Sequence, residues 1–198
     1  MTGTPTVLAV SGSVREGSYT HSALEHVLAA AEAAGAETDM LDLRTAEVPL
    51  FDPDADDQGV GRSVDRVRAA DAVVLGTPVY HGSYSGVLKN FHDFCGFDEY
   101  EDTPVALVAV AGGGSYGSTL EHLRSTVRGV HGHVVPRQVG IRSASDKFER
   151  DADAPDGRAC TDEDIADRLD SLGEAIVEAA LRFDERAVAD ATASCTDD

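Results

Sequence analysis

Short, continuous apolar runs alternate along the chain with segments in which apolar residues recur every three or four positions. The first pattern predicts buried strands, and the second predicts amphipathic helices. Strands are expected at residues 7–10, 37–43, 72–76, 105–111 and 133–135, the last resuming at 139–141. Helices are expected at residues 19–34, 63–70, 85–94, 118–131 and 162–190.

This alternation indicates the fold class α/β, with a parallel sheet that helices cover on both faces. No repeat or linker interrupts the 198 residues, so we expect a single domain, 1–198. A polar, acidic stretch at 143–161 is expected to be a surface excursion, followed by a long final helix at 162–190. Such sheets bind ligands beyond the carboxyl ends of their strands, so a site is expected in the loops after the first, third and fourth strands.

Acidic side chains dominate the composition. Sixteen Lys and Arg residues oppose 36 Asp and Glu residues, which gives a net charge of −20, and the only lysines are Lys89 and Lys147. Such a surface repels nucleic acid and anionic membranes, so neither is an expected partner. An acidic docking surface for another protein is one interpretation. Because the acids are scattered over the whole chain, we favour a halophilic source, in which high salt screens their repulsion.

Neither a membrane segment nor a metal site is predicted. No apolar run approaches the roughly 20 residues that a membrane-spanning helix needs, and the N-terminus has no basic signal region, so a cytoplasmic location is expected. Cys95, Cys160 and Cys195 are widely spaced, so we expect free thiols, with Cys95 in the core and Cys195 in a frayed tail. No histidine has carboxylates at a spacing typical of metal ligands.

The first loop, 11–18, reads SGSVREGS and joins a strand to a helix. A helix N-terminus presents unpaired N–H groups and a partial positive charge, so glycines and serines there make a site for a phosphate. Arg15 adds a charge-assisted contact, and Ser18 or Thr20 adds a hydroxyl. Alternatively, Ser18 only caps the helix and Arg15 points to solvent. The loop lacks GxGxxG and GxxxxGKS/T, which argues against a dinucleotide fingerprint and an NTPase.

The loops after the third and fourth strands suit a flat ligand with polar edges. The stretch GTPVYHGSYSGVLKNFHDF turns at Pro78 and Gly82 and projects Tyr80 and His81 beside exposed backbone amides. The alternatives are that Tyr80 is a packing residue and that His81 is an ordinary surface side chain. Three glycines at 112–114 allow the backbone to approach a ligand edge, where their N–H groups stabilise negative charge.

Together the three loops resemble those of the NADPH-dependent FMN reductase family, which has the flavodoxin-like fold. The family's first motif, G-S-x-R-x-x-S, is matched by Gly12, Ser13, Arg15 and Ser18. Its second motif resembles P-E-Y-N-G-S-x-x-G-x-L-K-N and is matched by Pro78, Tyr80, Gly82, Ser83, Gly86, Leu88, Lys89 and Asn90. Val79 and His81 depart from it, because the family usually has Glu and Asn there. The third motif is a glycine-rich loop before a helix, as at 111–117.

The resemblance covers residues 6–140, which we take as the core of the domain. It implies a three-layer α/β/α sandwich whose five-stranded parallel sheet has the order 2-1-3-4-5, and it implies FMN as the cofactor. The phosphate of FMN is expected on Ser13, Arg15, Ser18, Tyr19 and Thr20. The ring is expected against Pro78, Val79, Tyr80, His81, Gly82 and Ser83, with Gly112, Gly113 and Gly114 closing another edge.

The implied activity is hydride transfer from NADPH or NADH to FMN, and then reduction of a small-molecule acceptor such as a quinone, an azo dye, a metal ion or free flavin. The flavin performs this chemistry, so the only candidate catalytic residue is His81, for steering a proton or a substrate. The resemblance also implies a homodimer or homotetramer. Two alternatives remain: a flavodoxin-like FMN electron carrier without nicotinamide turnover, against which Arg15 argues, and a flavin-free regulatory or scaffold domain.

Overall fold

A five-stranded parallel sheet forms the middle layer of the computed structural model, which describes the backbone of residues 3–55 and 58–194 and the side chains of these ranges up to 183. The strands are β1 (Thr6–Ser11), β2 (Glu37–Asp42), β3 (Ala72–Pro78), β4 (Pro104–Val110) and β5 (His133–Ile141). Their order is β2-β1-β3-β4-β5, and every pairing between them is parallel. The expected α/β class and strand order are confirmed.

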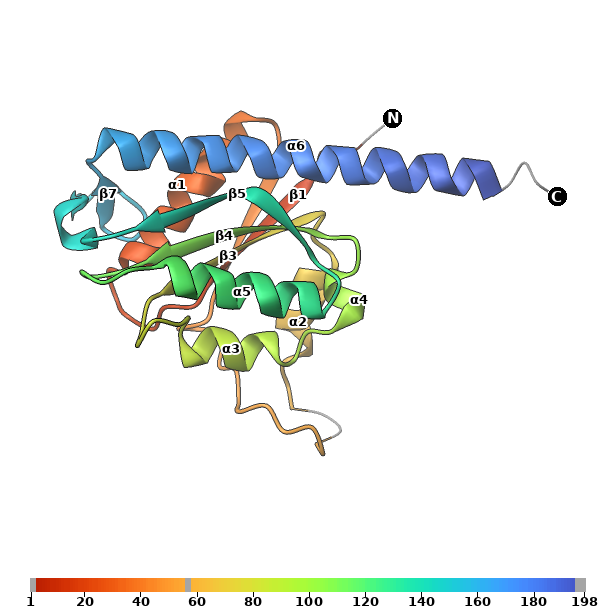
Figure 1. Cartoon of the computed structure of the whole chain (residues 1–198), viewed down its shortest axis with the longest axis horizontal. Coiled ribbons are helices and arrows are strands. Elements are labelled where there is room, and N and C mark those ends of the chain that lie inside the picture. The colour runs from red at the N-terminus through yellow and green to blue at the C-terminus, as the bar shows by residue number, and fades with distance from the viewer. Residues whose placement is uncertain (1–2, 56–57, 195–198) are drawn as a thin grey trace.

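Helices cover both faces of this sheet, as Figure 1 shows. One face carries α1 (Tyr19–Ala33) and α6 (Glu163–Ser194), and the other carries α2 (Gly61–Arg68), α3 (Gly86–His92), α4 (Phe97–Tyr100) and α5 (Gly117–Gly129). Successive side chains of a strand point to opposite faces. In β1, Val7 and Ala9 therefore enter the core beneath α1 and α6, whereas Leu8 and Val10 enter the other core.

Two glycines bring helix α1 close to its neighbours. A Cβ on Gly76 in β3 would lie 2.6 Å from a methyl of Leu24, so its absence lets α1 settle on the sheet beside the carboxyl end of β3. A Cβ on Gly173 in α6 would lie 2.6 Å from the carbonyl oxygen of Val27, so α6 packs closely against α1. These contacts hold the start of α1 in a fixed place at the edge of the sheet where a site is expected.

The segment 143–161 is more than the surface excursion that its acidic residues predict. It contains a short 3₁₀ turn, η1 (Ala144–Asp146), and an antiparallel hairpin of β6 (Phe148–Arg150) and β7 (Arg158–Cys160). Phe148 is 3% exposed and belongs to the core cluster beneath α1 and α6. Ala144 is likewise buried. Two apolar side chains thus attach the segment to the domain, although charged residues outnumber them.

Other boundaries also differ from the expected ones. Strand β5 runs unbroken from His133 to Ile141 because a register shift against β4 lets it pass Pro136 and stay paired. Helix α6 begins one residue later than expected, since Asp162 Oδ1 accepts a hydrogen bond at 3.0 Å from the amide of Ile165 and acts as the cap. The same helix ends at Ser194, and the short helix α4 has no counterpart in the expected elements.

The core position expected for one cysteine is confirmed. Cys95 is 5% exposed, and burial raises the pKa of its thiol to about 12. Cys160 is half-buried, whereas Cys195 lies outside the described residues. Within the described ranges, no helix is long and apolar enough to cross a membrane.

Candidate functional site

A hollow of about 290 Å³ lies where the carboxyl ends of β1, β3 and β4 meet. Three of the predicted loops, together with η1, supply its walls. The lining residues are Ser13, Arg15, Gly17, Ser18, Tyr19, Thr20, Pro78, Val79, Tyr80, Val110, Gly112 and Ala144. All five residues predicted for a phosphate are among them, whereas His81, Gly82, Ser83, Gly113 and Gly114 do not line the hollow.

The start of α1 supplies the polar wall of the hollow. Ser18 has extended backbone angles and caps the helix, because its Oγ accepts hydrogen bonds from the amides of Thr20 at 3.2 Å and His21 at 3.4 Å. A hydroxyl that accepts in this way still carries a proton to donate. Capping and anion binding are therefore compatible roles for Ser18. Ser13 is 3% exposed, and its Oγ accepts from the amide of Arg15 at 3.3 Å.

Arg15 is the cation of this wall, and no carboxylate within the described part of the chain pairs with it. Its side chain is exposed and takes part in no ion pair or hydrogen bond with any residue that the structure describes. Arg44, by contrast, lies 3.3 Å from a carboxylate oxygen of Asp42. In a chain with a net charge of −20, an arginine that keeps its whole charge beside a helix N-terminus is suited to an anion from outside the protein.

The first two loops are locked to each other at Gly12. A Cβ on Gly12 would lie 2.7 Å from Cβ of Leu88 in α3, so only glycine fits here. The amide of Gly12 donates to the carbonyl of Gly76 at 2.8 Å, and Ser85 Oγ donates to the carbonyl of Gly12 at 2.6 Å. Ser85 also caps α3, accepting from the amide of Leu88 at 3.2 Å. Gly12 and Leu88, matched in separate motifs, are thus direct neighbours in space.

The second loop ends in a tight two-residue turn. Tyr80 and Ser83 exchange backbone hydrogen bonds of 2.9 and 3.0 Å, and the two residues between them both have positive φ, 51° at His81 and 76° at Gly82. Two central residues with positive φ are typical of a type I′ turn, in which Asn-Gly is favoured. Histidine, like asparagine, is enriched at positive φ. The His-for-Asn departure from the family motif therefore preserves the turn.

Helix α5 holds that turn in place. Ser118 Oγ donates to the carbonyl of Gly82 at 2.6 Å, and Ser83 Oγ lies 3.0 Å from Nδ1 of His122. The turn and its exposed His81 thus stand at the rim of the hollow, while Tyr80, 48% exposed, remains in its wall. Pro78 and Val79 continue this wall toward β4, and the amide of Val79 donates to the carbonyl of Val110 at 2.8 Å.

The glycine-rich loop after β4 contributes less to the hollow than its sequence predicts. Only its first glycine, Gly112, lines the hollow, and the carbonyl of Gly113 accepts from Arg142 Nε at 2.9 Å. The loop ends at Tyr116, whose ring occupies the space that a Cβ on Gly140 would fill, 2.0 Å away. This close packing fixes where α5 begins.

Three lining residues escaped the sequence analysis. Val110 and Ala144 are small apolar residues, and the amide of Ala144 donates to the carbonyl of Ala111 at 3.2 Å, which brings η1 against the end of β4. Gly17 lies within the first loop and has a φ of 61°. The glycine itself was the signal in the sequence, because glycine favours such a left-handed conformation. Nothing in the acidic stretch around Ala144 distinguishes that residue before the chain is folded.

Two residues of the second motif act away from the hollow. Lys89 pairs with Asp93 one turn further along α3. The side chain of Asn90 accepts from the amide of Phe51 at 2.9 Å and donates to the carbonyl of Pro49 at 2.7 Å, so it holds the loop before α2. No group of three or more metal-ligating side chains occurs among the described residues.

Fold and site together define a class of protein. Buried hydroxyls, an unneutralised guanidinium and a helix N-terminus suit a phosphate, and the adjoining apolar wall of Pro78, Val79, Val110 and Ala144 suits a flat ring. The hollow lies at the carboxyl edge of a sheet of order 2-1-3-4-5, beside the point where the strand order reverses. This is a flavodoxin-like protein whose hollow has the chemistry that a phosphate-bearing, ring-containing ligand requires.

Known proteins identify the family. Residues 5–146 match the family of NADPH-dependent FMN reductases. An FMN-dependent NADPH-azoreductase of Staphylococcus haemolyticus is 35% identical over an alignment of 148 positions, which covers 69% of this chain and 77% of that protein. An NADPH azoreductase of a Bacillus species is 40% identical over an alignment of 107 positions, which covers 52% of this chain and 60% of that protein.

Solved structures agree on the fold. FerB of Paracoccus denitrificans, a flavoenzyme NAD(P)H:(acceptor) oxidoreductase, superposes with a TM-score of 0.72 at 24% identity, over 90% of this chain and 98% of that one. Two-electron reduced flavodoxin of Megasphaera elsdenii gives a TM-score of 0.59 at 20% identity, over 87% and 98% of the two chains. The chain belongs to the NADPH-dependent FMN reductase family. It is an FMN-dependent NAD(P)H oxidoreductase.

Substitutions at His81 distinguish its role in the backbone turn from a role of its imidazole in turnover. His81→Asn should leave the free energy of unfolding within about 0.5 kcal/mol of the wild-type value, because asparagine tolerates positive φ. His81→Val should lower it by about 1–3 kcal/mol, because a β-branched residue is strained there. Urea denaturation of both variants measures this difference. Equal stability of the two variants would contradict the left-handed turn, and loss of turnover in His81→Asn would show that the imidazole itself is needed.

Proposed function

We propose that the hollow is the FMN site, with the phosphate at the start of α1 and the ring along the second loop. Ser13, Arg15, Ser18, Tyr19 and Thr20 hold the phosphate, and Pro78, Val79, Tyr80 and Gly112 lie along the ring. The observation that carries this assignment is the unneutralised Arg15 beside two buried serine hydroxyls and a helix N-terminus. His81, Gly82 and Ser83 shape the rim, and Gly113 and Gly114 extend it on the opposite side.

The side chains of this site bind and orient, and the cofactor supplies the redox chemistry. When bound, FMN would supply the hydride and electron transfer between NAD(P)H and the acceptor. The hydroxyls and Arg15 fix the phosphate end, while the apolar wall excludes water along one side of the ring. Among the described residues that line the hollow, none is a histidine, aspartate or glutamate. His81 stands outside the lining, and we assign it to the turn.

We propose a flat aromatic acceptor, an azo compound or a quinone, for this enzyme. Two relatives in the family carry the name azoreductase. The ring of Tyr80 is about half exposed where the hollow opens, so a planar substrate can stack on it.

The decisive experiment is a spectroscopic titration. The protein is purified in molar salt and inspected for the yellow absorbance of FMN, and NADPH and then NADH are added without oxygen. We expect the protein to bind FMN and the nicotinamide to bleach the yellow absorbance within the time of one turnover. Addition of an azo dye or a quinone should then restore the absorbance. Bound flavin that neither nicotinamide bleaches would indicate an electron carrier. A colourless protein that FMN cannot reconstitute would contradict the assignment of the hollow.

The role of Arg15 is tested by its removal. Arg15→Ala should weaken FMN binding by about 1.5–3 kcal/mol, because it deletes a charge-assisted contact to the phosphate. This corresponds to a roughly 10- to 150-fold rise in Kd, measured by quenching of flavin fluorescence. Arg62→Ala is the matched control, since Arg62 is exposed on α2 and has no partner among the described residues. An equal Kd for the Arg15 and Arg62 variants would refute the contact.

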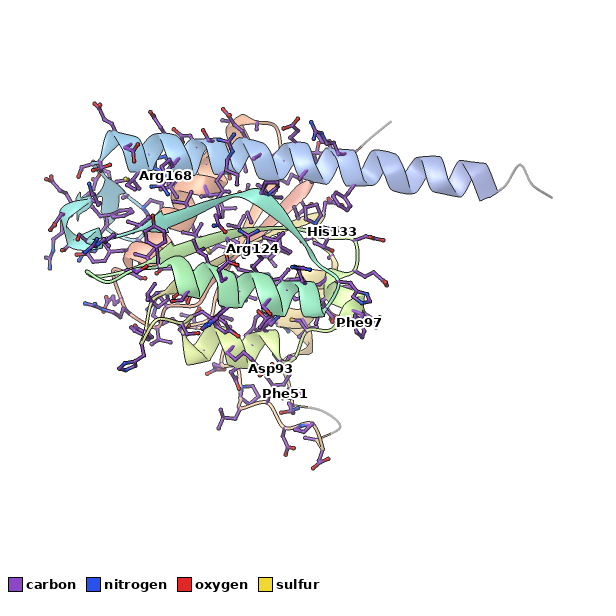
Figure 2. The ribbon with its side chains drawn as sticks, viewed as in Figure 1. Phe51, Asp93, Phe97, Arg124, His133 and Arg168 are labelled. Carbon is purple, nitrogen blue, oxygen red and sulfur yellow. The ribbon has the colours of Figure 1, made fainter. Side chains whose placement is uncertain are left out.

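We further propose a homo-oligomer formed through the loop between β2 and α2. Leu50 is 84% exposed in this loop, part of which projects beneath α3 (Figure 1). The loop is held firmly, because Asn90 bonds to its backbone and the ring of Phe51 packs edge-on against Phe94 at 5.1 Å. Figure 2 shows Phe51 at this lower edge of the molecule. An exposed apolar pair on a well-held loop is typical of an interface.

Leu50→Glu should therefore dissociate the oligomer, because a carboxylate cannot be buried there without a partner. Light scattering coupled to gel filtration gives the mass directly. Phe97→Glu serves as the control, since Phe97 is 52% exposed on α4 and its ring packs on His131, at 4.5 Å between centroids, rather than on this loop (Figure 2 labels both Phe97 and Phe51). A monomeric wild-type protein, or a Leu50→Glu variant with the wild-type mass, would contradict the proposal.

A further inference from the structure

The hairpin of β6 and β7 lies beyond the part of the chain that matches the family, which ends at residue 146. It nevertheless packs against the first residue of α1. The ring of Phe148 in β6 lies 5.7 Å from the ring of Tyr19, centroid to centroid, and Tyr19 lines the hollow. A segment outside the family match thus contacts the wall that we assign to the phosphate.

Arg158 in β7 makes two further contacts with that wall. Its Nε donates to the carbonyl of Gly17 at 2.8 Å, and its guanidinium carbon lies 4.5 Å from the centroid of the Tyr19 ring. Both contacted residues line the hollow, whereas Arg158 itself does not. Within the described ranges the guanidinium has no carboxylate partner, so these two contacts account for its position.

Gly17 is the residue of the first loop whose conformation most needs support. Its φ of 61° is left-handed, and glycine also has the largest conformational freedom in the unbound loop. A hydrogen bond from a cation to its carbonyl fixes the orientation of the peptide that leads directly into Ser18, the cap of α1. Stacking of the Arg158 guanidinium on the Tyr19 ring also fixes the side chain of Tyr19. The loop is therefore held from outside before any ligand enters.

We propose that Arg158 is a positioning residue that preorganises the first loop for the FMN phosphate. This inference rests on the proposed function of the hollow. Rigidifying a loop in its bound conformation strengthens binding because less ordering remains to be done. Arginine is required rather than lysine, because only a planar guanidinium donates from Nε and stacks on a ring at once. The hairpin thereby becomes part of the cofactor site without touching the cofactor.

The test compares FMN with riboflavin, which has the same ring and lacks the phosphate. Arg158→Ala should raise the Kd for FMN roughly tenfold, as expected for the loss of one charged hydrogen bond, and leave the Kd for riboflavin unchanged. Arg158→Lys should recover only a small part of the FMN affinity, and it provides a second variant in case the alanine protein does not fold. Arg150→Ala is the matched control, because Arg150 lies directly opposite Arg158 in the hairpin.

The outcomes are distinct. Unchanged FMN binding in Arg158→Ala would overturn the proposal, and so would an equal loss of FMN and riboflavin, which indicates a general structural role. Full recovery by Arg158→Lys would overturn the requirement for a guanidinium. Failure of the wild-type protein to bind FMN would instead overturn the proposed function of the hollow. The role of Arg158 is supported by a loss that is specific to FMN and absent from Arg150→Ala.

Discussion

The contact of Gly12 with Leu88 and Ser85 is the constraint on which the site depends. It holds the end of β1 against the start of α3, so the wall that we assign to the phosphate and the wall that we assign to the ring have one fixed separation. Any side chain at position 12 would push Leu88 away, and loss of the Ser85 hydroxyl would free both the Gly12 carbonyl and the first turn of α3. The hollow between the loops exists because these few atoms meet at van der Waals distance.

Charge gives the same site its selectivity. In a chain with a net charge of −20, many lysine and arginine side chains form ion pairs with carboxylates, as Arg44 does with Asp42. Arg15 and Arg158 are among the arginines that have no carboxylate partner within the described residues. They stand on the inner and outer sides of one loop that also carries a helix N-terminus. A local positive region of this kind attracts a phosphate that the rest of the surface repels.

Much of this arrangement follows from local sequence. The strands are recognisable because fully buried parallel strands are continuously apolar, and the first loop is recognisable because Gly, Ser and Arg at a helix start have few other uses. The left-handed turn at His81 was harder to foresee, since a histidine there looks like a side chain offered to substrate. A halophilic source and a cytoplasmic location stay predictions, because composition supports them and folding geometry does not bear on either.

By itself, the sequence determined the α/β class, the candidate loops and, through its motifs, the family, because each depends on residues close together in the chain. Tertiary structure decided which loop residues form the hollow and which only support it. Ala144 and Arg158 reach the first and third loops because Phe148 and Ala144 bury apolar surface that many acidic neighbours conceal. The contact of Arg158 with Gly17 joins residues 141 positions apart, and no local pattern of hydrophobic and polar residues encodes that distance.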